Sequence, residues 1–182
     1  MAQISGSKKR KGFTLVEEVV VIAVIAILAI PLATLLNQSI QAQIYGTKDV
    51  KGQYYANLIM QDFERRIRRA DSGSIVITTG NPYEVGFIYM DSDRNGKATS
   101  SVKYKYRLEN PGTKDALFYR DDGNGWQLFP TGLEKGIIQN FEIDESKSNL
   151  DTSNPPCYIY VEIETGTGTI LQKTIYLVNY HP

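Results

Sequence analysis

The chain has little of the chemistry on which most enzymes depend. Its 182 residues include one cysteine and one histidine. The single cysteine, Cys157, excludes a disulfide within the chain and a paired-cysteine metal site. The histidine, His181, is the last residue but one, so a histidine-based triad or zinc site has nothing to build on. No G-x-S-x-G turn or phosphate loop occurs either. We therefore expect a protein that is not an enzyme, in which Cys157 is a small buried strand residue.

The formal net charge is zero, but the charges are unevenly distributed along the chain. Residues 1–12 carry four cations and no acid, whereas residues 71–182 carry ten basic and fifteen acidic residues, a net charge of −5. An acidic C-terminal part argues against a broad nucleic-acid-binding face, because such a face must neutralise phosphates with excess lysine and arginine.

A long uncharged segment follows the basic start. No charged residue occurs from Val19 to Leu36, and the next charge after Glu18 is Lys48. As a helix, this segment is long enough to cross a hydrocarbon layer of about 30 Å. Under the positive-inside rule, the cations at residues 8–11 predict that residues 1–12 lie in the cytoplasm and that most of the chain lies outside.

Two carboxylates, Glu17 and Glu18, stand at the head of this apolar segment. A carboxylate near a helix end inside the bilayer costs about 2–3 kcal/mol, so it needs a partner. The sequence Lys11-Gly12-Phe13-Thr14-Leu15-Val16-Glu17 resembles the class III signal of type IV prepilins and type II secretion pseudopilins.

This resemblance implies a processing step and an assembly role. A membrane aspartyl prepilin peptidase would cut between Gly12 and Phe13, methylate the new amine and leave a mature chain of 170 residues (182 − 12). The family's glutamate corresponds to Glu17, which would pair with the Phe13 ammonium group of a neighbouring subunit and so select the register between subunits. Glu18 is an extra acid where the family usually has an apolar residue, so either carboxylate is a candidate partner.

Two other interpretations of this segment remain open: an uncut signal anchor, and a conventional secretory signal removed after its apolar core. The second normally has no Glu-Glu pair opening that core. Pro31, the nineteenth residue of the mature chain, predicts a kink, because proline removes a helix hydrogen bond. Major pilins often carry such a proline three positions later.

Residues 37–70 are predicted to continue the helix. The apolar residues recur at four-residue spacing and form one face suited to packing on a sheet. They are Tyr55, Ile59, Phe63 and Ile67. Gly46 and Gly52 are candidate bends.

Four arginines crowd the end of this predicted helix: Arg65, Arg66, Arg68 and Arg69. The simpler interpretation is interaction with the helix dipole and with nearby carboxylates. The alternative is contact with DNA, as in a competence pilus, which the acidic surroundings disfavour.

Beyond residue 70 the sequence changes to short β-strand patterns separated by turn residues. Apolar and polar residues alternate strictly in residues 102–108 and 159–164, as expected for antiparallel strands with one covered face. Strands are predicted at Ser74–Thr79, Glu84–Met90, Ser101–Leu108, Ala116–Arg120, Trp126–Phe129, Ile137–Ile143, Tyr158–Glu164 and Leu171–Tyr180. A tight hairpin is expected at Asp122–Gly125.

The expected fold is α+β: a long N-terminal membrane-spanning helix whose distal half packs on an antiparallel sheet. The chain is expected to divide into a leader (1–12), a transmembrane and assembly helix (13–36), an amphipathic continuation (37–70) and a β-rich exported domain (71–182). This order of elements resembles the layout of J-type minor pseudopilins and W-type minor pilins.

The resemblance implies a minor pilin or pseudopilin that initiates or tips a filament. Its partners would be prepilin peptidase, the membrane, and other major and minor pilins or pseudopilins. The protein would lie in the inner membrane before assembly and in a periplasmic or cell-surface filament afterwards. The sequence does not distinguish among three assemblies in which the subunit would serve: an adhesion or motility pilus, a type II secretion pseudopilus and a DNA-uptake filament.

A calcium site is a further candidate. The sequence D-S-D-R-N-G opens at Asp91 and places oxygen ligands at Asp91, Asp93 and Asn95, with a glycine for the turn. The acid expected at loop position twelve is missing, so Asp121, Asp122 or another acid would have to complete the shell. A polar hairpin turn selects the same residues. The alternative function is accordingly a membrane-anchored adhesin or calcium-dependent binding protein that does not polymerise, with the twelve tyrosines as a possible adhesive face.

Overall fold

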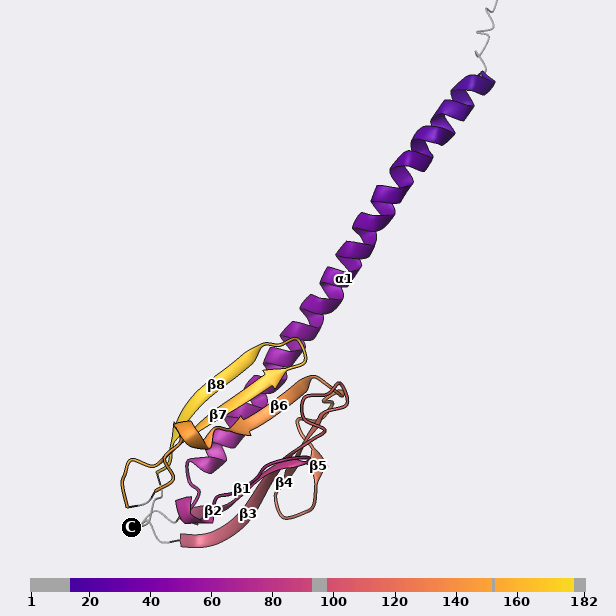
Figure 1. Cartoon of the computed structure of the whole chain (residues 1–182). Coiled ribbons are helices and arrows are strands. Elements are labelled where there is room, and N and C mark those ends of the chain that lie inside the picture. The colour runs from indigo at the N-terminus through magenta and orange to yellow at the C-terminus, as the bar shows by residue number, and fades with distance from the viewer. Residues whose placement is uncertain (1–13, 93–97, 152, 179–182) are drawn as a thin grey trace, which may run out of the picture. The chain divides into compact units, whose positions relative to one another are not determined.

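The computed structural model describes residues 14–92, 98–151 and 153–178. It divides into two compact units, Met1–Ile44 and Tyr45–Pro182, and one helix, α1, contributes to both (Figure 1). The elements are α1 (Leu15–Ile67), the short 3-10 helices η1 (Ser72–Ser74) and η2 (Glu145–Lys147), and the strands β1 (Val76–Thr78), β2 (Tyr83–Ser92), β3 (Ala98–Glu109), β4 (Leu117–Asp121), β5 (Gln127–Leu128), β6 (Ile138–Ile143), β7 (Tyr158–Thr165) and β8 (Ile170–Tyr176).

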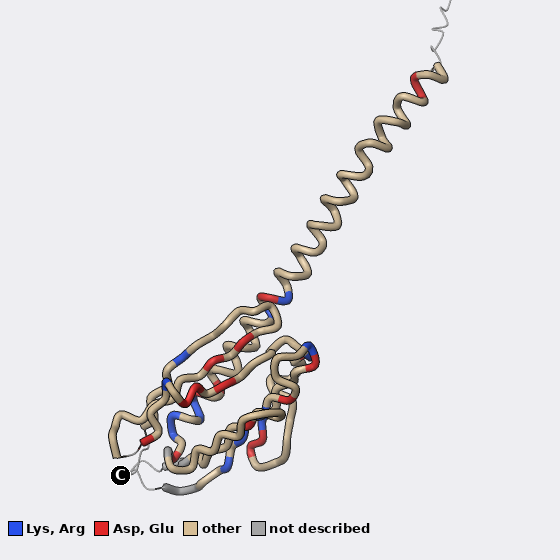
Figure 2. The backbone as a smooth tube through the Cα atoms, viewed as in Figure 1, with Lys and Arg blue, Asp and Glu red and all other residues tan. Residues whose placement is uncertain are grey.

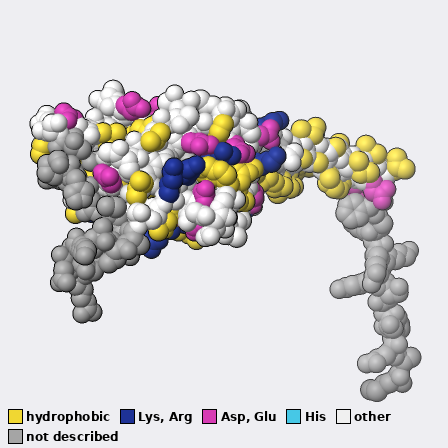
Figure 3. Space-filling model, turned by 90° about the horizontal axis from the view of Figure 1, so that it is seen from below, with side chains coloured by type: hydrophobic (Ala, Val, Ile, Leu, Met, Phe, Trp, Pro, Cys, Tyr) yellow, Lys and Arg dark blue, Asp and Glu magenta, His cyan; other side chains and the backbone are white. Residues whose placement is uncertain are grey.

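In the first unit, α1 is a continuous helix. It runs through Pro31 as one helix, so the proline does not end it. A proline removes one backbone hydrogen bond, and the strong helix formers on both sides of it maintain the others. The side chains from Leu15 to Leu36 are all exposed in the isolated chain, and hydrophobic side chains predominate on the face of this helix that Figure 3 shows.

The second unit contains two antiparallel sheets beside the distal part of α1, where the sequence predicted one (Figure 1). The first has the order β1-β2-β3-β4-β5, and the second has the order β6-β7-β8. Every predicted strand is present, and the predicted α+β class is confirmed. Alternation indicates which face of a strand is covered, but it does not indicate which strands pair, so the division into two sheets was not predictable.

The strand registers explain the alternating patterns. In β3, Tyr106 and Leu108 are fully buried, whereas Lys105 and Arg107 lie on the other face. In β7, Ile159, Val161 and Ile163 are buried in the same way. The predicted hairpin is confirmed, since β4 pairs with β5 through Tyr119 opposite Leu128 and Arg120 opposite Gln127. Each sheet therefore has one covered face.

Phe63 is the centre of the core and joins α1 to both sheets. Its ring makes edge-to-face contacts with Phe87 of β2 at 6.0 Å, Tyr106 of β3 at 5.1 Å and Phe141 of β6 at 5.3 Å between ring centroids. Such pairs add about 0.5–1.5 kcal/mol each beyond the area that they bury. The helical face predicted from four-residue spacing is the face that packs here, with Ile59, Phe63 and Ile67 fully buried.

The two glycines predicted to bend α1 lie in a continuous helix, and they differ in surroundings. A Cβ atom on Gly52 would lie 3.0 Å from Cβ of Thr165, at the end of β7. Around Gly46 no atom lies within 4 Å of such a Cβ. Gly52 therefore allows close packing between helix and strand, whereas Gly46 has no packing role among the described residues.

Because their surroundings differ, substitution by alanine should change the free energy of unfolding in opposite directions at Gly46 and Gly52. Gly46→Ala should raise the free energy of unfolding by about 0.5–1 kcal/mol, because alanine is the better helix former. Gly52→Ala should lower it by about 1–2 kcal/mol, because β7 must move to admit the methyl group. Thermal unfolding of the full chain in detergent measures both. Equal effects of the two substitutions would contradict the close approach at Gly52.

Candidate functional site

The start of α1 is organised by a reciprocal pair of side chains. Thr14 precedes the first helical residue, Leu15, and stands at the N-cap position. The Glu17 Oε2 atom accepts hydrogen bonds from the Thr14 backbone N–H at 2.8 Å and from the Thr14 hydroxyl at 3.0 Å. In return, the Glu17 backbone N–H donates to the Thr14 hydroxyl oxygen at 3.4 Å. This is a capping box, which satisfies donors that a helix start otherwise leaves unpaired.

The capping box distinguishes the two carboxylates that the sequence left equivalent. The Glu17 side chain folds back toward the start of α1, where it contacts Thr14. Among the described residues, the Glu18 carboxylate has no hydrogen bond or ion pair. Gly12 and Phe13, the predicted processing residues, lie outside the described residues. The T-x-x-E spacing from Thr14 to Glu17 is the signal that could have predicted this geometry.

A long uncharged stretch follows these two acids. Figure 2 shows the chain without charge from there to the Lys48 region. Among the described residues, α1 is the one helix that is long and apolar enough to cross a membrane by length and composition. The part of α1 that lies in the first unit can therefore be buried in lipid or against other apolar helices, and either surrounding would be poor in water. A carboxylate at the head of such a helix is stable there only with a cationic or hydrogen-bonding partner.

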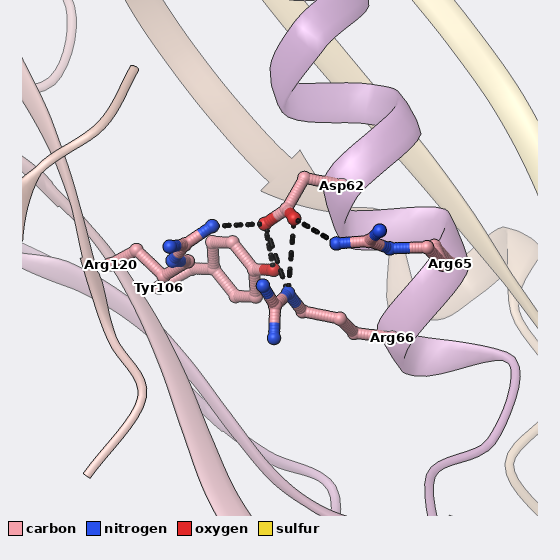
Figure 4. Close-up of polar contacts among 5 residues, drawn as sticks. All are labelled: Asp62, Arg65, Arg66, Tyr106 and Arg120. Carbon is pink, nitrogen blue, oxygen red and sulfur yellow. Dashed lines mark hydrogen bonds and ion pairs between the residues drawn. The ribbon is translucent and has the colours of Figure 1, made fainter. Parts of the chain in front are cut away.

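A second polar cluster surrounds Asp62 in the globular unit (Figure 4). Asp62 accepts hydrogen bonds from the Tyr106 hydroxyl at 2.8 Å, from Arg120 at 3.0 Å and from Nε of Arg66 at 3.1 Å. Arg65 contacts the same carboxylate at 3.2 Å from the exposed side. The Asp62 side chain is 10% exposed and Tyr106 is fully buried. The cluster therefore joins α1 to β3 and β4.

The charge state of Asp62 follows from these contacts. Burial alone would raise the pKa of its carboxyl group, but the hydrogen bonds from Tyr106 and Arg120 and the charge of Arg66 lower that pKa below its usual value. Burial and the Asp62 charge raise the pKa of Tyr106 well above its usual value. Asp62 is thus a carboxylate at neutral pH, and Tyr106 donates a hydrogen bond to it. The role of this cluster is structural, because its contacts join α1 to β3 and β4.

The arginines at the end of α1 are held by nearby groups, as the simpler interpretation predicted. Arg68 contacts Glu64 at 2.7 Å, and Glu64 also pairs with Lys173 of β8 at 2.6 Å. Arg69 donates to the Tyr89 hydroxyl at 3.1 Å. Nothing in these contacts favours the alternative of DNA binding.

Cys157 is fully buried, as predicted, and its thiol lies 3.5 Å from the Asp151 carbonyl oxygen. Burial raises the pKa of this thiol, and the Asp151 charge raises it further. A buried, protonated thiol is a poor nucleophile, so Cys157 acts as a packing residue.

The predicted calcium ligands are only partly described. Asp91 lies near the end of β2, where its Cα pairs with that of Ser100. Asp93 and Asn95 lie outside the described residues. Asp121 accepts hydrogen bonds from the backbone N–H groups of Gly123 and Gly125. In the part of the chain that the structure describes, no group of three histidine, cysteine or acidic residues is placed to hold a metal ion.

Comparison with known protein families finds a match at the start of the chain. Residues 7–33 match the family model described as the prokaryotic N-terminal methylation motif. No curated protein and no solved structure matches the chain. The match covers the cations at residues 8–11, Glu17, Glu18 and most of the uncharged segment from Val19 to Leu36. The chain therefore carries the class III signal of type IV pilin-like proteins, followed by an α+β globular unit, and its apolar helix is a membrane anchor. This signal implies processing by prepilin peptidase and assembly with other pilins.

Proposed function

We propose that this protein is a minor pilin or pseudopilin, a structural subunit that initiates or tips a type IV pilus, secretion pseudopilus or DNA-uptake filament. The observation that carries the proposal is the Glu17 carboxylate, held by Thr14 at the head of an exposed apolar helix inside the methylation motif. Such an acid is costly in lipid unless a cation meets it. The amine released by cutting between Gly12 and Phe13 supplies a cation at the same level of a neighbouring helix.

The proposed mechanism follows from this pairing. Before assembly, the leader lies in the cytoplasm and the globular unit lies outside it, as the four cations at residues 8–11 favour. Lateral association of apolar helices removes water from Glu17. The Phe13 ammonium group of an adjoining subunit then offsets the buried charge and selects the stagger between helices. The role is structural and involves no catalysis.

The second candidate is a membrane-anchored protein that does not polymerise, such as an adhesin or calcium-dependent binding protein. The observation that favours it is the D-S-D-R-N-G sequence from Asp91, whose oxygens suit calcium. The anchored protein needs no processing and no free amine at Phe13, so the two candidates differ in what happens to the chain at the membrane.

Fractionation of producing cells separates the candidates. Filaments are sheared from the cells and the chain is quantified in the filament and membrane fractions, with and without the prepilin peptidase. A filament subunit should occur in the sheared fraction and be confined to the membrane when the peptidase is absent. An anchored binding protein would stay in the membrane fraction in both strains, and this result would overturn the proposal.

A further inference from the structure

Strand β8 lies at one margin of the second sheet (Figure 1), where it pairs with β7 alone. Immediately after the strand, the Leu177 N–H donates to the Cys157 carbonyl, which precedes β7, at 3.0 Å. In an antiparallel ladder, residues bonded in this way alternate with residues whose N–H and C=O groups point in the other direction. The register of β8 on β7 therefore identifies the residues whose backbone groups point outward. They are Ile170, Gln172, Thr174 and Tyr176.

The outward backbone groups of β8 form an open edge. In the part of the chain that the structure describes, β7 is the one segment to which the backbone of Ile170–Tyr176 bonds. The next outward residue, Val178, shows what such a group does where a partner is present, since its N–H donates to the Arg68 carbonyl at 2.8 Å. The side chains of all four outward residues of β8 are exposed, so this edge faces solvent.

The other sheet margins are covered or short. At β6, the opposite margin of the same sheet, the Gln139 carbonyl accepts from the Gly112 N–H at 2.7 Å, and the Ile143 N–H donates to the Tyr83 hydroxyl at 2.8 Å. The margins of the first sheet are β1, which has three residues, and β5, which has two. Strand β8 has seven residues. Among the described strands, β8 is therefore the long edge that is left open.

Strand β8 carries none of the features that usually keep an open edge from pairing. It has no proline, glycine or bulge, and Lys173 is its single charged residue. Lys173 lies on the same face as the buried Ile175, and its Nζ pairs with Glu64 of α1 at 2.6 Å. Two apolar side chains at the ends of the strand, Ile170 and Tyr176, are 50% and 56% exposed. An edge of this kind is a template for a further strand.

The geometry does not suit symmetric pairing of two copies at this edge. Strand β8 runs alongside α1 in the same direction, because Thr169 before the strand bonds Asp49, whereas Lys173 within it pairs with Glu64. Two identical edges pair symmetrically only as antiparallel strands, and that arrangement would point the α1 helices of the two copies in opposite directions. Copies anchored in one membrane point in the same direction. A strand from a different chain meets no such conflict.

We propose that β8 accepts a strand from a different subunit of the same assembly, which extends the second sheet by one strand. Backbone hydrogen bonds supply the affinity, and about seven partner residues, roughly 23 Å of strand, cover the edge. Ile170 and Tyr176 favour β-branched or aromatic neighbours, whereas Glu162 and Glu164 on β7 disfavour acidic ones on the same face. The inference rests on the proposed function, because a subunit that begins or tips a filament must join unlike subunits.

Amide hydrogen exchange, resolved residue by residue, tests the added strand in the native chain. In the full chain isolated in detergent, the amides of Gln172, Thr174 and Tyr176 should exchange fast, whereas those of Lys173 and Ile175 should exchange slowly because they bond to β7. In the chain enriched from sheared filaments, the three outward amides should slow at least about tenfold and the two inward amides should change little. Equal rates of the outward amides in the two preparations would overturn the proposal.

Photo-crosslinking in producing cells identifies the occupant. With p-benzoylphenylalanine in place of Tyr176, the full-length chain should form an adduct with a different chain. Thr174→Pro removes an outward N–H but no bond to β7, and it should lower the adduct yield about tenfold. Thr174→Val, the matched control, keeps that N–H and should stay within about twofold. An adduct between two copies of this chain, or equal yields from the two variants, would overturn the proposal. The exchange measurement needs no variant, so it decides the matter even where Thr174→Pro fails to fold.

Leader cleavage, measured in the same cells, separates this inference from the proposed function. A chain with its leader removed that enters filaments, but whose outward amides still exchange fast, removes only the added strand. A chain that stays in the membrane with an intact leader, and that still forms the Thr174→Pro-sensitive adduct, supports the added strand and removes the filament proposal.

Discussion

The chain with both Glu17→Gln and Glu18→Gln is expected to reach the filament fraction at least about thirtyfold less than the native chain. Without either carboxylate, the Phe13 ammonium group of the adjoining subunit has no anionic partner in the apolar helix bundle. An uncompensated charge at such a site costs about 2–3 kcal/mol or more, which corresponds to this factor. The measurement is the ratio of the chain in sheared filaments to the chain in membranes, by immunoblot.

The single substitutions identify the partner of the amine. Glu17→Gln should account for most of the loss, because the Thr14 hydrogen bonds already hold Glu17 at the helix start. Glu18→Gln is the matched control on the next residue, and it should assemble within about threefold of the native chain, since Glu18 makes none of the Thr14 contacts that hold Glu17 at the helix start. Assembly of the double variant at the native level would remove the ion-pair mechanism.

Asp62→Ala is expected to lower the free energy of unfolding of the globular unit by about 3–5 kcal/mol. The substitution leaves Arg66, Arg120 and the Tyr106 hydroxyl without their shared acceptor, and breaking a buried ion pair by removing one partner costs this much. Thermal unfolding of the full chain in detergent, at pH 7, gives the shift. Tyr106→Phe is the control, because it removes one hydrogen bond of the cluster and should cost only about 1–2 kcal/mol.

The same cluster predicts the direction of a pH effect. The pKa of Asp62 is lower in the folded chain than in the unfolded chain, so its contribution is complete above the unfolded value of about 3.9 and is lost as the pH falls through the folded value. The difference in stability between the native chain and Asp62→Ala should therefore shrink as the pH falls below about 4. A difference that stays constant from pH 7 to pH 2 would contradict the ionised cluster.

Much of the fold could be predicted because local patterns decide it. Four-residue spacing indicated the buried face around Phe63, and two-residue alternation in β3 and β7 indicated their covered faces. The pairing of strands into two sheets depends on contacts distant in sequence and was missed. The close approach at Gly52 was missed for the same reason, since Thr165 lies 113 residues further along the chain (165 − 52).

The candidate site, too, could be predicted from the sequence only in part. The resemblance to the class III signal made Glu17 a candidate from the sequence, and a local signal, the T-x-x-E spacing, could also have predicted its contact with Thr14. The Asp62 cluster could not be predicted, because Tyr106 and Arg120 come from strands whose register is set only in the folded unit. The Arg65–Arg69 group indicated excess positive charge but not which carboxylate would receive it.

Assembly requires the amine that cutting after Gly12 frees, and intact-mass spectrometry of the chain purified from its native cells detects that cut. We expect a chain of residues 13–182 with one methyl group on the Phe13 nitrogen. A chain that keeps residues 1–12 in cells with an active prepilin peptidase would contradict the account.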